Sequence, residues 1–153
     1  MNLLAKPRAL AVVLLCAAVL IGGALAYTAT RPTGFQPTHQ LRVGAEHAYE
    51  FFAPATDLQC EVSHSPALGT YAYCQTASHN RSVRMEADGT FKTCETGYGR
   101  CLGNPGLGTV TLSPGTRVID GPLTCDLTAD TVSCYNSSQR GFVVSPTSLA
   151  SYK

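Results

Sequence analysis

The hydrophobic positions of the chain fall into two contrasting patterns. Residues Ala9 to Ala26 form one uninterrupted apolar run, whereas the sequence after it alternates between apolar and polar residues in short stretches. Glycine, proline, asparagine or aspartate ends these stretches. No later window carries apolar residues at helical spacing over enough length to nucleate a helix. The pattern therefore predicts an all-β domain after an N-terminal hydrophobic leader or anchor helix.

Short alternating stretches predict the strands of this domain. Asp88-Gly89 suits a tight hairpin turn, because glycine accepts a positive φ at no steric cost. Helix is expected only as a turn or two around Pro146 to Ala150, in a polar tail that runs to Lys153. The hairpins fit either a small β-sandwich or a barrel-like domain. The predicted strands and hairpins are Tyr49–Ala53, Leu58–Val62, Tyr71–Gln75, Val83–Glu86, Thr90–Cys94, Thr109–Leu112, Arg117–Ile119, Leu123–Tyr135 and Gly141–Val144.

Two of the predicted hairpins resemble each other. Leu58 to Ser63 and Leu123 to Thr128 share the order apolar, polar, Cys, acid, branched apolar, hydroxyl. A second cysteine follows in each unit, at Cys74 and Cys134, and the downstream loop is five residues shorter. This likeness fits an internal duplication and equally fits convergence on a stapled hairpin, so both interpretations remain open.

The cysteines predict a disulfide framework. Six remain beyond the leader, an even number in a small domain that follows an export signal. Cysteines that face each other across a hairpin come close enough to bond, which predicts Cys60 with Cys74 and Cys125 with Cys134. Cys94 and Cys101 are left to pair. Each such loop contributes about 2.5 to 3 kcal/mol of stability in the chain-entropy model. All six cysteines are interpreted as structural.

The N-terminus carries an export signal. Lys6 and Arg8 precede the apolar run, and Ala24-Leu25-Ala26, with small residues at its first and third positions, forms a cleavage site. The run also just reaches the length of a membrane-spanning helix, so cleavage after Ala26 and retention as an anchor are both open. The chain accordingly divides into a signal peptide or anchor (1–26), a flexible tether rich in threonine, proline and glycine (27–45) and a disulfide-bonded β-domain (46–153).

The charges beyond the leader are balanced and dispersed. Nine lysine and arginine residues accompany ten acidic residues after Ala26, with no run of like charge. Nucleic-acid binding requires a clustered basic face, and so does electrostatic attachment to a membrane surface. We therefore expect no nucleic-acid partner, and membrane contact only through the N-terminal segment if it is uncleaved.

A search for reactive motifs yields no catalytic, cofactor-binding or metal-binding residue. The sequence has no C-x2-C or H-x3-H pair for a metal or redox site and no G-x-S-x-G nucleophile motif. We interpret His39, His47, His64 and His79 as solvated side chains. The acid pairs Glu46/Glu50 and Asp57/Glu61 lie in predicted strand or loop, where four-residue spacing does not bring carboxylates together. Gly97 to Gly99 and Gly103 to Gly108 are read as loops, and Tyr71 and Tyr73, on one strand face, as packing residues rather than a ligand platform.

The C-terminal half resembles a known type of protein. Cys101 to Thr109, Leu112 to Gly115, Gly121 to Cys125, Val132 to Cys134 and Arg140 to Ser145 are similar to segments of small exported proteins of mycobacteria and related actinobacteria. The likeness extends more weakly over Ala53 to Cys74 and Asp88 to Cys94. That family is one of unknown function, so the resemblance implies an envelope or secreted protein and carries no catalytic residue across. The leader lacks the lipobox that some relatives have.

These observations predict an exported, non-catalytic domain of the cell envelope, secreted or anchored to the outer face of the plasma membrane. Its role would be binding or structural, with an envelope protein or a polysaccharide as partner. The alternatives are an envelope enzyme, either a hydrolase or a thiol-disulfide protein, and a secreted inhibitor or effector.

Overall fold

The structure is a computed structural model that describes residues 34–44, 47–53, 57–95, 101–103 and 109–152. Every secondary-structure element within these ranges is a β-strand, so the all-β prediction is confirmed. They are β1 (His39–Arg42), β2 (Tyr49–Phe52), β3 (Leu58–Ser65), β4 (Gly69–Thr76), β5 (Arg81–Glu86), β6 (Phe91–Glu95), β7 (Val110–Thr111), β8 (Thr116–Asp120), β9 (Leu123–Leu127), β10 (Val132–Asn136), β11 (Gly141–Val144) and β12 (Leu149–Tyr152).

The predicted leader or anchor, 1–26, lies outside the described residues. Over the ranges that the structure does describe, no helix has the length and apolar character needed to cross a membrane.

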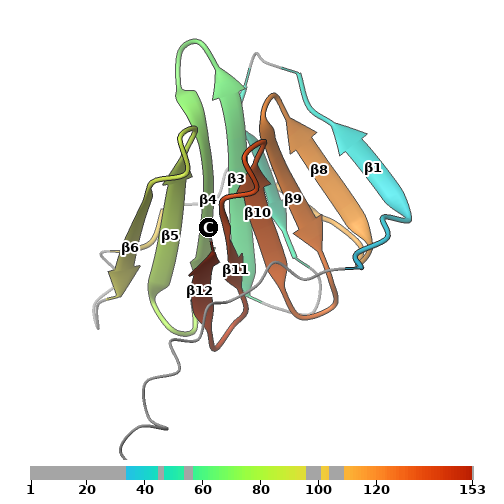
Figure 1. The fold of residues 1–153 in the computed structure, drawn as a ribbon. Coiled ribbons are helices and arrows are strands. Elements are labelled where there is room, and N and C mark those ends of the chain that lie inside the picture. The colour runs from blue at the N-terminus through green and yellow to red at the C-terminus, as the bar shows by residue number, and fades with distance from the viewer. Residues whose placement is uncertain (1–33, 45–46, 54–56, 96–100, 104–108, 153) are drawn as a thin grey trace, which may run out of the picture.

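The strands form two six-stranded sheets that pack against each other (Figure 1). Sheet A has the order β1-β8-β9-β10-β11-β12, and sheet B has the order β6-β5-β4-β3-β2-β7. Five consecutive strands in each sheet, β8 to β12 and β2 to β6, form an antiparallel meander. The sixth strand of each sheet is parallel to its neighbour.

The parallel strands interlock the two halves of the chain. β1 precedes the first meander but pairs with β8 of the second, and β7 precedes the second meander but pairs with β2 of the first. Each sheet therefore contains an outer strand from the segment that leads into the other meander. Neither meander completes its own sheet.

The two meanders correspond residue by residue across their ladders. Phe51, Cys60, Cys74, Val83 and Thr93 are successive cross-strand partners in sheet B. The matching row in sheet A is Val118, Cys125, Cys134, Phe142 and Ser151.

The loops that follow β4 and β10 also correspond. Asn80 and Gln139, with φ of 48° and 62°, are the non-glycine residues with positive φ in the described chain. Each lies three residues before its member of the matching rows, Val83 or Phe142. The same strand order and the same backbone exception favour duplication over convergence.

One hydrophobic core lies between the sheets. Phe51, Leu58, Val118, Leu127 and Phe142 are fully buried in it, together with the four cysteines of the two central hairpins. The alternation of strand side chains explains this arrangement, because every second residue of a strand points to the same face. The cysteines of the two hairpins, which the sequence predicts as cross-strand pairs, thus face the core.

Three disulfides form, and they join the same pairs that the sequence predicts. Cys60–Cys74 and Cys125–Cys134 each link directly opposed residues of a hairpin, with 4.1 Å between Cα atoms. Cys94–Cys101 links β6 to the segment after it, with 5.4 Å between Cα atoms. Three disulfides indicate a protein that folds in an oxidising, extracytoplasmic environment.

Two local predictions differ from the structure. The segment 27–45, predicted as a tether, includes β1, whose residues pair with β8. The helical turn expected around Pro146 to Ala150 is wrong, because Leu149 to Tyr152 form an edge strand against β11. Both missed strands, β1 and β12, are short. β1 pairs with residues far along the chain and β12 follows a proline-containing turn, so local pattern alone does not reveal them.

The Asp88-Gly89 turn is confirmed, with φ of 81° at Gly89.

Candidate functional site

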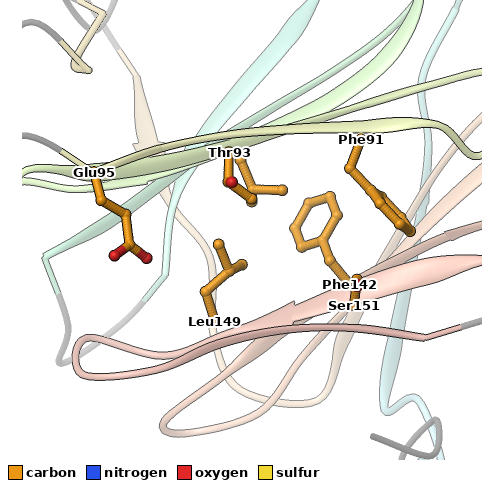
Figure 2. Close-up of a pocket in the computed structure, with 7 residues that line it drawn as sticks. Phe91, Thr93, Glu95, Phe142, Leu149 and Ser151 are labelled. Carbon is orange, nitrogen blue, oxygen red and sulfur yellow. The ribbon is translucent and has the colours of Figure 1, made fainter. Parts of the chain in front are cut away.

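A cleft of about 400 Å³ opens between the two sheets where each ends in an edge strand. β5 and β6 form one wall, and β11 and β12 form the other. Figure 2 shows Phe142, Leu149 and Phe91 directed toward the space between the walls. The volume lies in the range of roughly 300 to 1,000 Å³ that small-ligand sites occupy. The lining residues are Val83, Phe91, Thr93, Glu95, Phe142, Leu149 and Ser151.

The alternation of side chains along the strands places these residues in the cleft. Val83 and Phe142 face the core beside the central disulfides, and they form the floor of the cleft. Thr93 and Ser151 are their partners on the edge strands and are exposed at the mouth. The floor is therefore apolar and the mouth carries hydroxyls, a common combination in binding sites.

The cleft is built from equivalent positions of the two halves. Val83 corresponds to Phe142 and Thr93 to Ser151 in the matching rows. One step further along the ladders, Phe91 pairs with Met85 as Leu149 pairs with Val144. Both meanders therefore contribute matching residues to the cleft, and Glu95 is an additional contribution of the first meander.

Glu95 is the ionisable residue among those that line the cleft. Its Oε1 lies 2.9 Å from Nε of Arg81, within ion-pair distance, and the Glu95 side chain is 57% exposed. An ion pair this exposed contributes about 0 to 1 kcal/mol to stability. The carboxylate at the mouth thus remains open to a further cation.

The outer face of sheet B contains a compact polar cluster. The Tyr71 hydroxyl donates to Glu61, and the Arg84 guanidinium lies 3.6 Å from the centroid of the Tyr71 ring. Burial, reinforced by the Glu61 carboxylate, raises the pKa of Tyr71 to about 12 despite the opposing charge of Arg84. Tyr71 therefore stays neutral, and the Arg84 guanidinium covers one face of its largely buried ring.

A strap of three residues, Cys101 to Gly103, lies over the same outer face. The Tyr73 hydroxyl donates to the Cys101 carbonyl at 3.1 Å, and Gln75 Nε2 donates to the Gly103 carbonyl at 2.9 Å. The Gly103 amide donates to Gln75 Oε1 at 2.6 Å. The Cys94–Cys101 bridge attaches the strap to β6, and the Tyr73 hydroxyl is used to hold the strap in place.

Asp120 and His64 meet where β8 and β3 approach each other. Asp120 is 1% exposed, and its Oδ2 accepts from the His64 backbone amide at 2.7 Å. The His64 ring is engaged elsewhere, with Nδ1 2.9 Å from Thr70 Oγ1. Burial raises the pKa of Asp120, and the hydrogen bond and charge of His64 partly oppose the shift. The contact is a backbone-to-carboxylate tie between sheets and not an acid-base pair.

The acid pairs considered from spacing are not the ones that the fold assembles. Glu50 and Glu61 are opposed across β2 and β3, although they belonged to different predicted pairs. Thr109 donates to Glu50 at 3.1 Å, and Tyr71 donates to Glu61, so each carboxylate has its own neutral donor. Glu46 and the loop Gly97 to Gly99 lie outside the described residues.

Within the described ranges, no three or more histidine, cysteine, aspartate or glutamate side chains gather closely enough to hold a metal ion.

No family model, curated protein or solved structure matches this chain. The sequence pattern predicts Val83 and Phe142 as ordinary strand residues and places Leu149 in the helical turn expected around Pro146 to Ala150. Their hydrophobic character carries no signal that distinguishes a cleft floor from a closed core.

Proposed function

We propose that this chain is an exported, non-catalytic binding domain of the cell envelope, and that its ligand occupies the cleft between β6 and β12. The observation that carries the proposal is the cleft itself, with its apolar floor, two hydroxyls and one carboxylate at the mouth. Such a site binds by shape and burial, with a few polar groups that fix orientation.

The covalent framework and the N-terminus support the envelope location. Three disulfides suit an oxidising compartment, and the apolar run of residues 9–26 suits an export signal or anchor. The resemblance to exported actinobacterial proteins points the same way. An envelope protein or polysaccharide remains the expected source of the ligand.

The rival enzyme interpretation draws little support from the titratable groups. Tyr71 is held neutral, and the Asp120 carboxylate contacts the His64 backbone rather than its ring. A thiol-disulfide role would need an accessible bridge. Cys60–Cys74 and Cys125–Cys134 are wholly buried, and Cys101 of the third bridge is 6% exposed.

The test is affinity capture from envelope extract with the full exported chain. Ser151→Phe fills the cleft from an exposed position of β12, and Val110→Phe adds the same ring at β7, a strand at the opposite edge of sheet B. The proposal predicts a species retained by the wild-type chain and by Val110→Phe, and absent with Ser151→Phe. Retention of the same species by all three proteins would contradict it.

A further inference from the structure

The hydrogen-bonding phase of the edge strands determines what the mouth of the cleft can bind. In an antiparallel ladder, residues alternate between pairs that exchange backbone hydrogen bonds and pairs that do not. A residue that does not bond to its inner neighbour turns its N–H and C=O groups to the other side. On an edge strand, that side is open to a new partner.

The backbone contacts at the strand ends fix this phase in sheet B. The Glu86 amide donates to the Thr90 carbonyl at 2.9 Å, so Thr90 faces β5. Counting along β6, Lys92 and Cys94 also bond toward β5. Phe91, Thr93 and Glu95 therefore direct their backbone groups away from the sheet, toward the open edge.

The same residues line the cleft with their side chains. Phe91, Thr93 and Glu95 are the contribution of β6 to the cleft wall. In sheet A the Ser145 amide donates to the Ser148 carbonyl at 2.9 Å, which gives Leu149 and Ser151 the corresponding outward phase. The mouth thus combines an apolar space with open backbone donors and acceptors on both rims.

We propose that the ligand is an extended peptide segment that adds to β6 as a further strand of sheet B. This inference rests on the proposed function of the cleft. Residues of the peptide opposite Phe91, Thr93 and Glu95 would exchange backbone hydrogen bonds with β6, and their side chains would point to the cleft, since paired residues share a face. Backbone pairing supplies affinity, and the cleft selects alternate side chains.

Charge and polarity define the peptide further. The Glu95 carboxylate is exposed at one end of the β6 wall, so it favours a lysine or arginine at the residue opposite. The apolar lining residues Val83, Phe142 and Leu149 favour an aliphatic side chain at the neighbouring inward position. The expected ligand therefore has an aliphatic and a basic residue two positions apart.

Two other occupants fit less well. A lipid chain would fill the apolar floor and leave the backbone groups of Phe91, Thr93 and Glu95 without partners. A second copy of β6, paired antiparallel about Thr93, would place each Glu95 against the Phe91 of its partner, where the carboxylate gains no cation. An external basic peptide satisfies both the backbone and the charge.

The experiment selects a phage-displayed library of short linear peptides on the full exported chain. Enriched peptides are then measured by fluorescence anisotropy against Thr93→Pro and Thr93→Val. Proline removes the outward amide of Thr93 without removing a ladder hydrogen bond, and an edge strand tolerates it. Valine keeps the amide and the branched shape, so it is the matched control.

Both variants lack the Thr93 hydroxyl, so strand addition predicts that Thr93→Pro binds about tenfold or more weakly than Thr93→Val, which keeps the amide. Backbone amide exchange in the wild-type chain gives an independent readout that does not depend on the folding of the proline variant. The peptide should slow exchange at Phe91, Thr93 and Glu95.

Three results would overturn strand addition: no enriched peptide, unchanged affinity with Thr93→Pro, or a dimer formed through β6 without peptide. Ser151→Phe separates this failure from that of the proposed function. If Ser151→Phe abolishes capture and Thr93→Pro does not, the cleft binds a ligand that is not an added strand. If neither variant has an effect, both proposals are wrong.

Discussion

The first and second meanders, β2 to β6 and β8 to β12, share one framework. Each places a buried disulfide at the centre of its sheet, and Asn80 and Gln139 occupy the same left-handed position after the second hairpin strand. Each sheet also takes its outermost strand from the segment before the other meander. The shared features lie in the core and in the path of the backbone.

The differences lie on the outer faces. Cys94 and Tyr152 are equivalent positions of the two edge strands, opposite Ser82 and Gly141. Cys94 bonds to Cys101 and holds the strap, whereas the Tyr152 hydroxyl lies 2.9 Å from Ser133 Oγ. The two rims of the cleft are therefore held by different chemistry, a covalent bridge for β6 and a hydrogen bond for β12.

The charges differ as well. In sheet B, Glu50 and Glu61 face each other and rely on neutral donors. At the equivalent positions of sheet A, Arg117 makes a two-point ion pair with Asp126, at 2.6 and 2.8 Å. Tyr135 also donates to Asp126, at 3.1 Å. At these positions sheet A thus has a partly buried ion pair, whereas the donors described for sheet B are the hydroxyls of Thr109 and Tyr71.

The largest expected effect comes from breaking the shared core staples. Cys60→Ala/Cys74→Ala and Cys125→Ala/Cys134→Ala should each lower the free energy of unfolding by about 3 kcal/mol, because the unfolded chain gains freedom. Urea unfolding of the variants measures this loss. Removal of Cys94 and Cys101 should cost less, about 2.5 kcal/mol, since its loop is the shortest of the three. Equal stability of wild type and the two core variants would contradict the shared role.

The next effect tests the charge difference between the sheets. Asp126→Asn should cost about 2 kcal/mol, because it removes the charge partner of Arg117 in a site where Asp126 is 4% exposed. Glu61→Gln, at the equivalent position, should cost less than about 1 kcal/mol, since it keeps an acceptor for Tyr71. Chemical denaturation of both variants tests the ranking, and a greater loss for Glu61→Gln would reverse the comparison.

A pH titration tests the inter-sheet tie of Asp120, whose equivalent in the first meander is Ala53 and carries no charge. Burial raises the pKa of Asp120, so folding favours its protonated form. The stability it contributes is complete below the unfolded pKa and is lost as the pH rises through the folded pKa. Asp120→Asn should therefore gain stability relative to wild type as the pH rises, measured by urea unfolding across the acidic range.

Asp88→Asn provides a control of opposite sign. Hydrogen bonds from the backbone and side chain of Thr90 lower the pKa of Asp88. Its contribution is present above the unfolded pKa and is lost as the pH falls through the folded pKa. If the free energy of unfolding of wild type and Asp120→Asn depends on pH in the same way, Asp120 does not contribute to the pH dependence of stability.

The smallest effect concerns the two left-handed residues. Gln139→Gly should stabilise by about 0.5 to 1 kcal/mol, because glycine adopts positive φ freely. Asn80→Gly should gain less, since asparagine tolerates this region better than glutamine. Differential scanning calorimetry can resolve the order. A destabilised Gln139→Gly would show that side-chain contacts outweigh the backbone preference there.

Sequence pattern predicts the parts of this fold that local chemistry determines. The alternating stretches around Cys60, Cys74, Cys125 and Cys134 indicate their strands and their pairing, and Asp88-Gly89 indicates its turn. β1 escapes detection because β8, the strand it pairs with, lies about half the chain away. The cleft escapes detection because it forms where the edges of the two sheets lie next to each other. The hydrophobic character of Val83, Phe142 and Leu149 does not indicate where a sheet ends.

The most direct test of the account is amide hydrogen exchange along β6 and β12 in the free chain, followed residue by residue by NMR. The account predicts an alternation: fast exchange at Phe91, Thr93 and Glu95 and at Leu149 and Ser151, with slow exchange at Lys92, Cys94, Ala150 and Tyr152. Uniform protection along both strands, or the opposite phase, would show that the cleft mouth has no open backbone groups, and would contradict the proposed strand addition.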